Sequence, residues 1–250
     1  MPTKRERFLD VDFDVMPIDD LLTKVGSVEK ETPLQYVVTP NVDHVVRLHN
    51  RQDEFPTLPA IYRKADICVC DSKVLSKLAK WRGLDLPVTV GTDLAELVFD
   101  RVARDGDHIA VIGGDTLLLQ ELRTKFPHLS FAQHRPPMGL TRNADARRAA
   151  AEFIVREKPR FTFICVGSPQ QEMIAAEAAA LPGGGGMAFC VGAALEFITD
   201  RQKRAPKLAQ RMGLEWAHRL VTNPRRLWRR YLVEGPVIFV MAYRWRKSAA

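Results

Sequence analysis

The chain has 250 residues, 46% of them hydrophobic, which is enough to bury one substantial core and predicts one large domain with an appendage. It has no run of the roughly 20 apolar residues that cross a bilayer and no apolar leader in residues 1–14, which argues against a membrane-spanning or secreted protein. The net charge of +7 comes from residues 200–250, which contain thirteen Lys and Arg but only three acidic residues. The chain is therefore not evenly basic, which disfavours a protein that binds nucleic acid nonspecifically over its whole surface.

The four cysteines all lie in apolar, strand-like runs. They are Cys68, Cys70, Cys165 and Cys190. Such residues are usually reduced and buried in the cytosol, where we expect the chain to reside. A metal site built on the first two is the alternative, but no CxxC or Cys/His spacing accompanies them.

Near the N-terminus, three aspartates alternate ahead of a helix expected over residues 17–25. Asp10, Asp12 and Asp14 could bind a metal ion, as alternating aspartates do in some enzymes. We favour an exposed edge segment instead, because no strongly apolar strand precedes them to hold the carboxylates in a cleft.

The next strand ends in polar residues. Residues 36–41 predict a strand and a turn before a helix over 42–50. Thr39 and Asn41 therefore stand at the carboxyl end of a strand, where α/β sheets hold ligand groups. Asn41 is also suited to cap the helix, and both roles can coexist.

A second strand ends in a carboxylate. After a loop expected around residues 56–59, residues 65–71 predict a buried strand whose last residue is Asp71. A charge at that point requires a partner, water or a chemical role. The alternative is that Asp71 caps the helix expected over 72–82.

The middle of the chain contains a double glycine. A helix is expected to begin at Gly91, with Thr92 or Asp93 as its cap, and the strand after it ends in Gly113 and Gly114. This turn resembles a dinucleotide-binding fingerprint, but the third glycine of G-x-G-x-x-G is absent, so the support for NAD is weak. Further elements are expected over residues 115–126, 129–133 and 144–158.

The stretch from residue 161 begins with the hydrophobic pattern of a strand and continues with the sequence of a helix. Residues 161–166 are typical of a buried strand, and Gly167 ends it. A helix follows from Gln170, with Ser168 as its expected N-cap and Pro169 at its first position. Such a helix start presents unpaired N–H groups and suits a phosphate or diphosphate, although a plain crossover connection is an equal alternative.

Strands alternate with helices along the chain, which predicts a doubly wound, mostly parallel, Rossmann-like α/β sheet in residues 1–199. Gly192 closes the last expected strand. Together with Gly113 and Gly167 it would line one edge of the sheet. A nucleotide lying across that edge is the natural ligand.

The appendage, residues 200–250, is expected to be helical and rich in arginine. A helix restarts at Asn223 and Pro224, with arginines on one face and apolar residues on the other. The basic face holds Arg225, Arg226, Arg229 and Arg230, and the apolar face holds Leu227, Trp228, Tyr231 and Leu232. Such a helix either packs on the domain with its arginines toward a ligand or lies on an anionic bilayer.

The last apolar run, residues 237–243, is too short to span a bilayer. It suits shallow insertion into a membrane interface, with Arg244, Trp245, Arg246 and Lys247 at its margin. We expect peripheral, reversible attachment. The alternative is a solvated basic helix docked on the chain's own core.

Several short motifs follow one another in a characteristic order. They are Thr39-Pro-Asn41, residues 65–71, Gly91-Thr-Asp-Leu94, Gly113-Gly114, Gly167-Ser-Pro-Gln-Gln-Glu172, Arg204-Ala-Pro206, Gly213-Leu-Glu-Trp216, Arg219 and Asn223-Pro-Arg-Arg226. In this order the chain resembles the WecG/TagA/CpsF family of bacterial glycosyltransferases over roughly residues 8–235. The resemblance implies an inverting enzyme that uses neither a metal nor a cofactor. It would move a hexosyl unit, with N-acetylmannosamine-type sugars favoured, from UDP to a polyprenyl-diphosphate-linked sugar at the inner leaflet of the cell membrane.

The resemblance also assigns roles by position. It makes Asp71 the general base and places Thr39 and Asn41 in the same pocket. The residues then expected to contact the UDP-sugar are Gly113, Gly114, Gly167, Pro169, Gln171, Glu172 and Gly192. The tail arginines expected to complete the site are Arg219, Arg226 and Arg229. Positions at which the chain departs from the usual family residues, so that the sugar and acceptor stay unspecified, are Ser72, Val88 and Gln170.

The expected partners are therefore a UDP-sugar, a polyprenyl-diphosphate-linked acceptor and an anionic membrane surface, but no nucleic acid. Assembly into a homo-oligomer stays open. On the residues alone, two other functions stay open. One is a nicotinamide-dependent oxidoreductase, and the other is a nucleic-acid-binding module that uses the Arg-rich tail.

Overall fold

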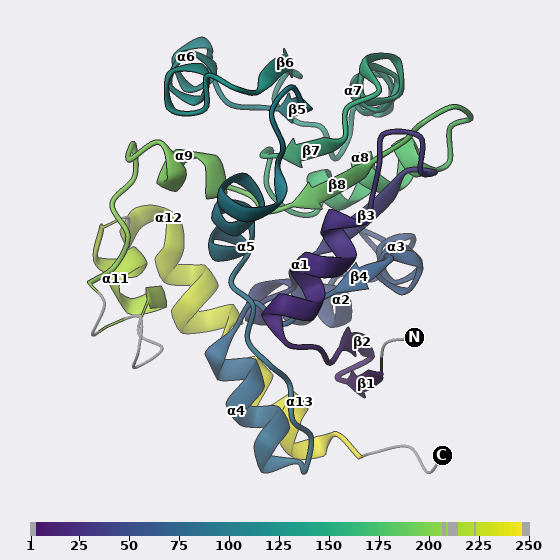
Figure 1. The fold of residues 1–250 in the computed structure, drawn as a ribbon. Helices are drawn as coiled ribbons and strands as arrows, with labels where there is room; N and C mark the ends of the chain where they lie inside the picture. Colours follow the sequence, from purple (N-terminus) through teal and green to yellow (C-terminus); the bar gives the residue numbers. More distant parts are fainter. Residues whose placement is uncertain (1–3, 207–208, 210–214, 223, 247–250) are drawn as a thin grey trace.

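The computed structural model describes residues 4–206, 209, 215–222 and 224–246. Its centre is a six-stranded, all-parallel sheet with the strand order β4-β3-β8-β7-β5-β6. The strands are β3 (Gln35–Val38), β4 (Ile67–Cys68), β5 (His108–Ile112), β6 (Ser130–His134), β7 (Phe161–Ile164) and β8 (Met187–Cys190). Helices cover both faces of the sheet (Figure 1), so the expected doubly wound, Rossmann-like α/β fold is confirmed.

Each face of the sheet has its own helical layer. One layer contains α1 (Ile18–Gly26), α5 (Gly91–Leu97), its π-helical continuation η1 (Val98–Val102), α6 (Thr116–Lys125) and α9 (Ala194–Ile198). The other contains α2 (Val42–Asn50), α3 (Leu58–Lys64), α7 (Ala144–Glu157) and α8 (Gln170–Ala179). Successive strand residues point to opposite faces, so Val37 packs into the first layer and Val38 into the second.

At two places along the sheet, the helices that follow neighbouring strands pass to opposite faces. After β5 the chain turns into α6 and outward to β6, whereas after β7 it turns into α8 and back to β8. The same reversal separates β3, followed by α2, from β8, followed by α9. Doubly wound folds bind ligands outside the carboxyl ends of the strands at such switch points. The topology therefore marks that edge of the sheet as the binding edge.

A separate antiparallel hairpin, β1 (Arg5–Phe8) and β2 (Val11–Asp14), corrects one expectation. Asp14 is buried, not exposed. Its carboxylate accepts a hydrogen bond from Arg5 Nε at 3.0 Å and another from the backbone N–H of Cys68 at 2.7 Å. A buried N–H requires an acceptor, and this aspartate supplies it to the edge strand β4. Asp14 thus fastens the hairpin to the sheet.

Two further local expectations differ from the structure. Helix α3 (Leu58–Lys64) begins within the loop expected around residues 56–59, because Pro59 stands in the first helical turn, where its missing N–H leaves no bond unmade. The residue before α5 is Val90, and the helix has no side-chain cap. The expectation that Thr92 or Asp93 caps this helix is therefore wrong.

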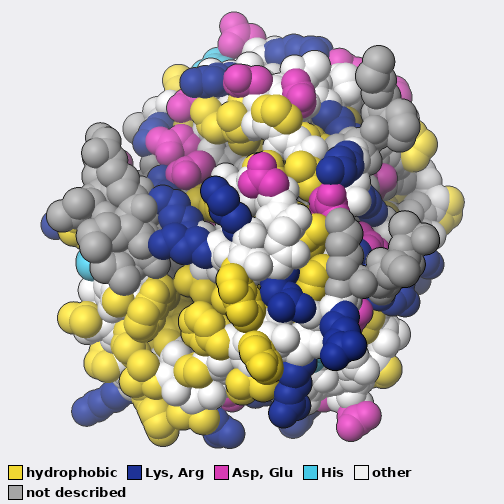
Figure 2. Space-filling model, turned by 90° about the horizontal axis from the view of Figure 1, so that it is seen from below, with side chains coloured by type: hydrophobic (Ala, Val, Ile, Leu, Met, Phe, Trp, Pro, Cys, Tyr) yellow, Lys and Arg dark blue, Asp and Glu magenta, His cyan; other side chains and the backbone are white. Residues whose placement is uncertain are grey.

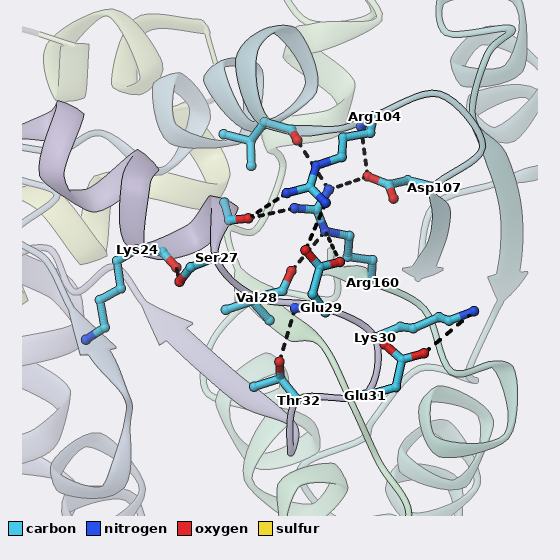
Figure 3. A network of polar contacts seen from close by, with 12 residues as sticks. Lys24, Ser27, Val28, Glu29, Lys30, Glu31, Thr32, Arg104, Asp107 and Arg160 are labelled. Atoms are coloured by element: carbon cyan, nitrogen blue, oxygen red, sulfur yellow. Dashed lines mark hydrogen bonds and ion pairs between the residues drawn. The ribbon is translucent and has the colours of Figure 1, made fainter.

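A buried arginine organises the amino end of the sheet (Figure 3). The Arg160 guanidinium donates to Asp107 Oδ2 at 2.6 Å and to the carbonyl oxygens of Val28 and Gly26, each at 2.9 Å. Arg104 lies beside it at the surface and also donates to the Gly26 carbonyl oxygen. Arg160 therefore joins the end of α1 to the starts of β5 and β7.

The described part of the appendage comprises α11 (Glu215–Thr222), α12 (Pro224–Trp228), the π-helical turn η2 (Arg229–Glu234) and α13 (Val237–Arg244). Helix α13 packs beside α2 and α4 (Lys73–Trp81), with α4 adjacent in Figure 1, and buries Ile238 and Ala242 in the domain core. Trp245, which the sequence placed at a membrane margin, packs edge-on against Phe8 with ring centroids 5.2 Å apart. Helix α13 and Trp245 are thus docked on the domain.

Within the described residues, no helix combines the length and the apolar character that crossing a membrane requires. Asn223 and Lys247, which the sequence placed at a helix start and at a membrane margin, lie outside the described residues.

Candidate functional site

Five of the residues expected to form the site follow strands at the carboxyl edge of the sheet, in the order in which the strands pair. Asp71 follows β4, Thr39 follows β3, Gly192 follows β8, Gly167 follows β7 and Gly113 follows β5. The three glycine turns stand side by side, because β8, β7 and β5 are neighbours. Adjacent strands are about 4.8 Å apart, so the row from the end of β4 to the end of β5 is about 19 Å long.

A cavity of about 610 Å³ opens at one end of this row, at the switch point between β5 and β7. Its lining includes Gly113, Arg135, Cys165 and Gln170. Gly113 has φ +98°, and a Cβ there would stand 2.9 Å from Val166 Cγ1 and 3.1 Å from the Cys165 carbonyl oxygen. Only glycine allows β5 and β7 to end this close together. The volume is within the range of small-molecule sites.

The surroundings of this cavity favour an anion. Arg135 is exposed and lines it, and Gln170 in the lining is the first residue of α8. Helix α8 has no side-chain cap, whereas α6, which begins directly after the double glycine, is capped by the Asp115 carboxylate. Helix N-termini carry unpaired N–H groups and a partial positive charge. A phosphate or diphosphate is therefore the ligand class that these groups suit.

Asp115 is held by a partner from the start of the appendage. Arg201 donates two hydrogen bonds to its carboxylate, at 2.6 and 2.7 Å, and the N–H of Leu118 donates a third at 2.8 Å. The Arg201 hydrogen bond, followed by that of Leu118, lowers the pKa of Asp115 well below its usual range. Asp115 is thus a carboxylate at neutral pH.

At the other end of the row, Asp71 and Thr39 converge on Gly91, the first residue of α5. A Cβ at position 91 would stand 3.0 Å from Thr39 Oγ1 and 3.4 Å from Asp71 Oδ2. Thr39 is buried and donates to the last carbonyl oxygen of β8 at 3.2 Å, which ties two strand ends together. The N-cap of α4 is Ser72, so the alternative role of Asp71 as that cap is wrong. Asp71 is half-buried at the edge of the sheet.

Asn41 caps α2 as expected, with its side chain accepting the N–H of Asp43 at 3.1 Å. From the same helix, Arg47 donates to Asp43 at 2.6 Å and to Ser168 Oγ at 2.9 Å. The N-cap position of α8 is Pro169, so Ser168 is not that cap, because Arg47 engages its hydroxyl instead. The capped start of α2 is thereby joined to the turn that follows β7.

Gln171 and Glu172 are buried, so they face inward from the open edge. Gln171 Oε1 accepts the N–H of Gly192 at 2.9 Å, and its Nε2 donates to Glu172 Oε1 at 3.0 Å. The Tyr62 hydroxyl donates to the same Glu172 oxygen at 3.2 Å. Burial raises the pKa of the Glu172 carboxyl and that of the Tyr62 hydroxyl. Gln171, which is hydrogen-bonded to Glu172, thus holds the glycine turn after β8 in place.

The structure does not bring the described tail arginine to Asp71. Arg229 is exposed and pairs with Glu234 at 3.5 Å. Glu234 also accepts from Arg51, which lies just beyond the carboxyl end of α2, whereas the site is at the amino end of that helix. Arg219 lies on α11 and Arg226 on α12, and their side chains are outside the described part of the structure.

Sequence analysis missed Arg135 and Arg201, and it named Gly91 only as a helix start and as part of a motif. Arg135 directly follows β6, and this position after a strand could have identified it as a candidate ligand-binding residue. No sequence pattern could have identified Arg201, because its partner Asp115 is 86 positions away in the chain. In the part of the chain that the structure describes, no cluster of three or more His, Cys, Asp or Glu side chains could hold a metal ion.

Comparison with known protein families gives one match that spans this whole edge. The family model described as "Glycosyl transferase WecG/TagA/CpsF family" matches residues 6–250. The matched range contains every strand of the main sheet, both ends of the row and the appendage.

Proposed function

Because the chain belongs to the WecG/TagA/CpsF family of glycosyltransferases, which act in cell-surface polysaccharide synthesis, we propose that it transfers a hexosyl unit from a UDP-sugar to a polyprenyl-diphosphate-linked acceptor. N-acetylmannosamine-type sugars are the favoured donors. One observation carries the proposal: an anion-favouring cavity and a carboxylate lie at opposite ends of a row of strand ends, about 19 Å long, on the same sheet edge. The Asp71 carboxylate reaches back along this row, since Asp71 Oδ2 and Thr39 Oγ1 both lie close to Gly91, so a donor extended from the cavity along the edge brings its anomeric carbon toward it.

The uridine and the α-phosphate occupy the cavity between β5 and β7, and the β-phosphate lies over the turns that follow β7 and β8. The anomeric carbon, which is bonded to a β-phosphate oxygen, then lies near the end of β3, beside Thr39. Gly113, Gly114 and Gly167 let the backbone approach the diphosphate closely. Arg135 and the start of α8, which has no side-chain cap, stabilise its negative charge. The β8 turn, held by Gln171 and Glu172, separates this region from the Asp71 end.

Asp71 is the general base. Its carboxylate removes the proton from the acceptor hydroxyl as that oxygen attacks the anomeric carbon. The bond from the anomeric carbon to the diphosphate oxygen breaks on the opposite face, UDP leaves, and the configuration inverts. General base catalysis contributes roughly 10²- to 10⁴-fold. Thr39 and the capped start of α2 at Asn41 fix the wall beside this carboxylate.

The departing UDP gains negative charge as the bond breaks. Without a metal ion, cationic side chains and helix N-termini supply the stabilisation. Arg219, Arg226 and Arg229 are proposed to contribute once the appendage closes over the edge. Arg229 has to leave Glu234 for this, and an exposed pair of that kind costs little to break.

A nucleotide panel tests the donor class. At a concentration 100-fold above its Kd, UDP should stabilise the chain by roughly 2.7 kcal/mol and raise the melting temperature by about 5–10 °C. UDP-N-acetylmannosamine should do the same, whereas NADH and a single-stranded RNA should have no effect. The measurement is a thermal shift at fixed salt. A shift with NADH or RNA, and none with UDP, would contradict the proposal.

A second surface supports attachment to a membrane. Exposed apolar side chains gather over α4, α12, η2 and α13, and Lys and Arg lie around and among them (Figure 2). Those with more than half of their surface exposed include Trp81, Trp228, Leu232, Phe239 and Tyr243. The face of α13 opposite its buried residues is therefore exposed to solvent. An apolar patch bordered by cations is typical of a protein that lies on anionic lipid.

Replacing Phe239 and Tyr243 together with serine should weaken binding to vesicles about tenfold or more, because both rings lose the apolar area that enters the interface. The assay is co-sedimentation with equal parts phosphatidylglycerol and phosphatidylcholine. Binding should also fall as salt rises.

Leu117→Ser is the matched control, since Leu117 is 52% exposed but lies on α6, apart from the patch. The control should sediment like the unchanged chain. If the control and the double variant lose binding equally, or if neutral phosphatidylcholine vesicles bind as well as anionic ones, the proposed surface is wrong.

A further inference from the structure

The start of the appendage is fastened to the sheet edge at two points. Arg201 pairs with Asp115 at the N-cap of α6, next to the double glycine that lines the cavity. Three residues later, Arg204 pairs with Asp93, two positions after Gly91 on α5. Residues 201–204 therefore run from the cavity end of the edge toward the end that holds Asp71 and Thr39.

The first of these pairs has the character of an exchangeable contact. Both side chains are reached by water, since Asp115 is 47% and Arg201 27% exposed, and a solvated ion pair adds little net stability. Asp115 also has another hydrogen bond, from the N–H of Leu118, so α6 keeps its cap when Arg201 leaves. Burial therefore does not hold the Arg201 and Asp115 side chains together.

The charge around the cavity favours exchange when a diphosphate is present. A diphosphate carries more negative charge than one carboxylate and offers several acceptor oxygens to the planar guanidinium. Arg135 already lines the cavity, and a second arginine beside it would hold the anion from another side. Asp115, left with its N-cap bond, would then face the solvent.

Resting on the proposed function, we propose that Arg201 binds the diphosphate of the donor. Before the donor binds, Arg201 is hydrogen-bonded to Asp115, and it moves from that carboxylate to the diphosphate when the cavity fills. Because Arg201 begins the appendage, its transfer couples donor binding to the position of residues 201–204. Asp115 acts as an internal competitor of the donor, and Arg201 binds the diphosphate directly.

The test is a double-variant cycle on the full chain, with UDP affinity measured by calorimetry. Arg201→Gln should weaken UDP binding about tenfold, the effect of losing one charge-assisted contact. Asp115→Asn should tighten it about threefold, because asparagine still caps α6 but no longer holds Arg201 by two charge-assisted hydrogen bonds, which leaves the weaker 3.7 Å contact with Glu121. In the double variant, the gain from Asp115→Asn should disappear, since there is no arginine to release.

Arg101→Gln is the matched control: Arg101 is exposed and paired with Asp19, away from the edge, and its loss should leave UDP affinity unchanged. If both edge variants weaken binding, the pair is only structural. If their effects add, Asp115 acts through its charge alone, and exchange is excluded. Absence of UDP binding by the unchanged chain would contradict the proposed donor, whereas normal binding by Arg201→Gln would contradict only the exchange.

Discussion

Replacing Asp71 with asparagine is expected to lower kcat for sugar transfer about 10²- to 10⁴-fold while leaving the affinity for UDP nearly unchanged. Asparagine keeps the size of the side chain but cannot accept a proton from the acceptor hydroxyl. UDP affinity should persist because Asp71 follows β4, whereas the cavity lies between β5 and β7. The measurements are steady-state transfer from a UDP-sugar and calorimetric UDP binding.

Asp53→Asn is a suitable control, because Asp53 is exposed and lies outside the sheet edge. It should retain full activity. A further readout is the pH profile: if Asp71 is the base, kcat of the unchanged chain should fall as acid protonates this carboxylate, and the residual activity of Asp71→Asn should lose that dependence. Equal activity in Asp71→Asn and the unchanged chain would remove the base assignment.

Replacing Arg160 with methionine is expected to cost roughly 3–5 kcal/mol of unfolding free energy. Only 3% of the Arg160 side chain is exposed, and its partner Asp107 is 14% exposed. Methionine fills similar space but leaves the Asp107 carboxylate without its cation and the Val28 carbonyl oxygen without its donor, whereas the Gly26 carbonyl oxygen keeps the hydrogen bond from Arg104 (Figure 3). Urea unfolding, followed by tryptophan fluorescence, gives the change from the midpoint and the slope.

Arg104→Met tests whether burial is the cause. Arg104 makes the same kind of contacts, to Glu29 at 2.8 Å and to the Gly26 carbonyl oxygen at 3.1 Å, but its side chain is 58% exposed. Its loss should cost no more than about 1 kcal/mol. Adding Asp107→Asn to Arg160→Met should recover part of the loss, because no unpaired charge remains. Equal losses for the two arginine variants would show that burial does not decide the cost.

The elements that sequence analysis predicted best are those with local causes. The helix expected over residues 42–50 is α2 with the same bounds, because Asn41 supplies its cap from within the first turn. The strand expected over 161–166 is present as β7, since its apolar residues and Gly167 lie next to one another in the chain. At Pro59 the same local rules gave a wrong prediction, because a proline that fits the first turn of α3 was taken as a sign of a loop.

The contacts that sequence analysis missed join residues far apart in the chain. The acceptor for the Cys68 N–H is Asp14, which is 54 positions away. No local pattern distinguishes a carboxylate that will be buried in this way from one that stays in water. The inward orientation of Glu172 likewise depends on Tyr62, which α3 brings to it from 110 positions away.

By itself, the sequence determined which chemical groups stand at strand ends: Asp71, Thr39 and the glycine turns, because strand period and turn residues are properties of neighbouring positions. Only the tertiary structure decided the order of those ends along the edge, with Asp71 at one end and the anion-favouring cavity at the other. It also turned Gln171 and Glu172 inward and set Arg201 on Asp115. The physical reason is that parallel pairing and burial join groups that are distant in the chain, and the energy of those contacts depends on the whole packed molecule.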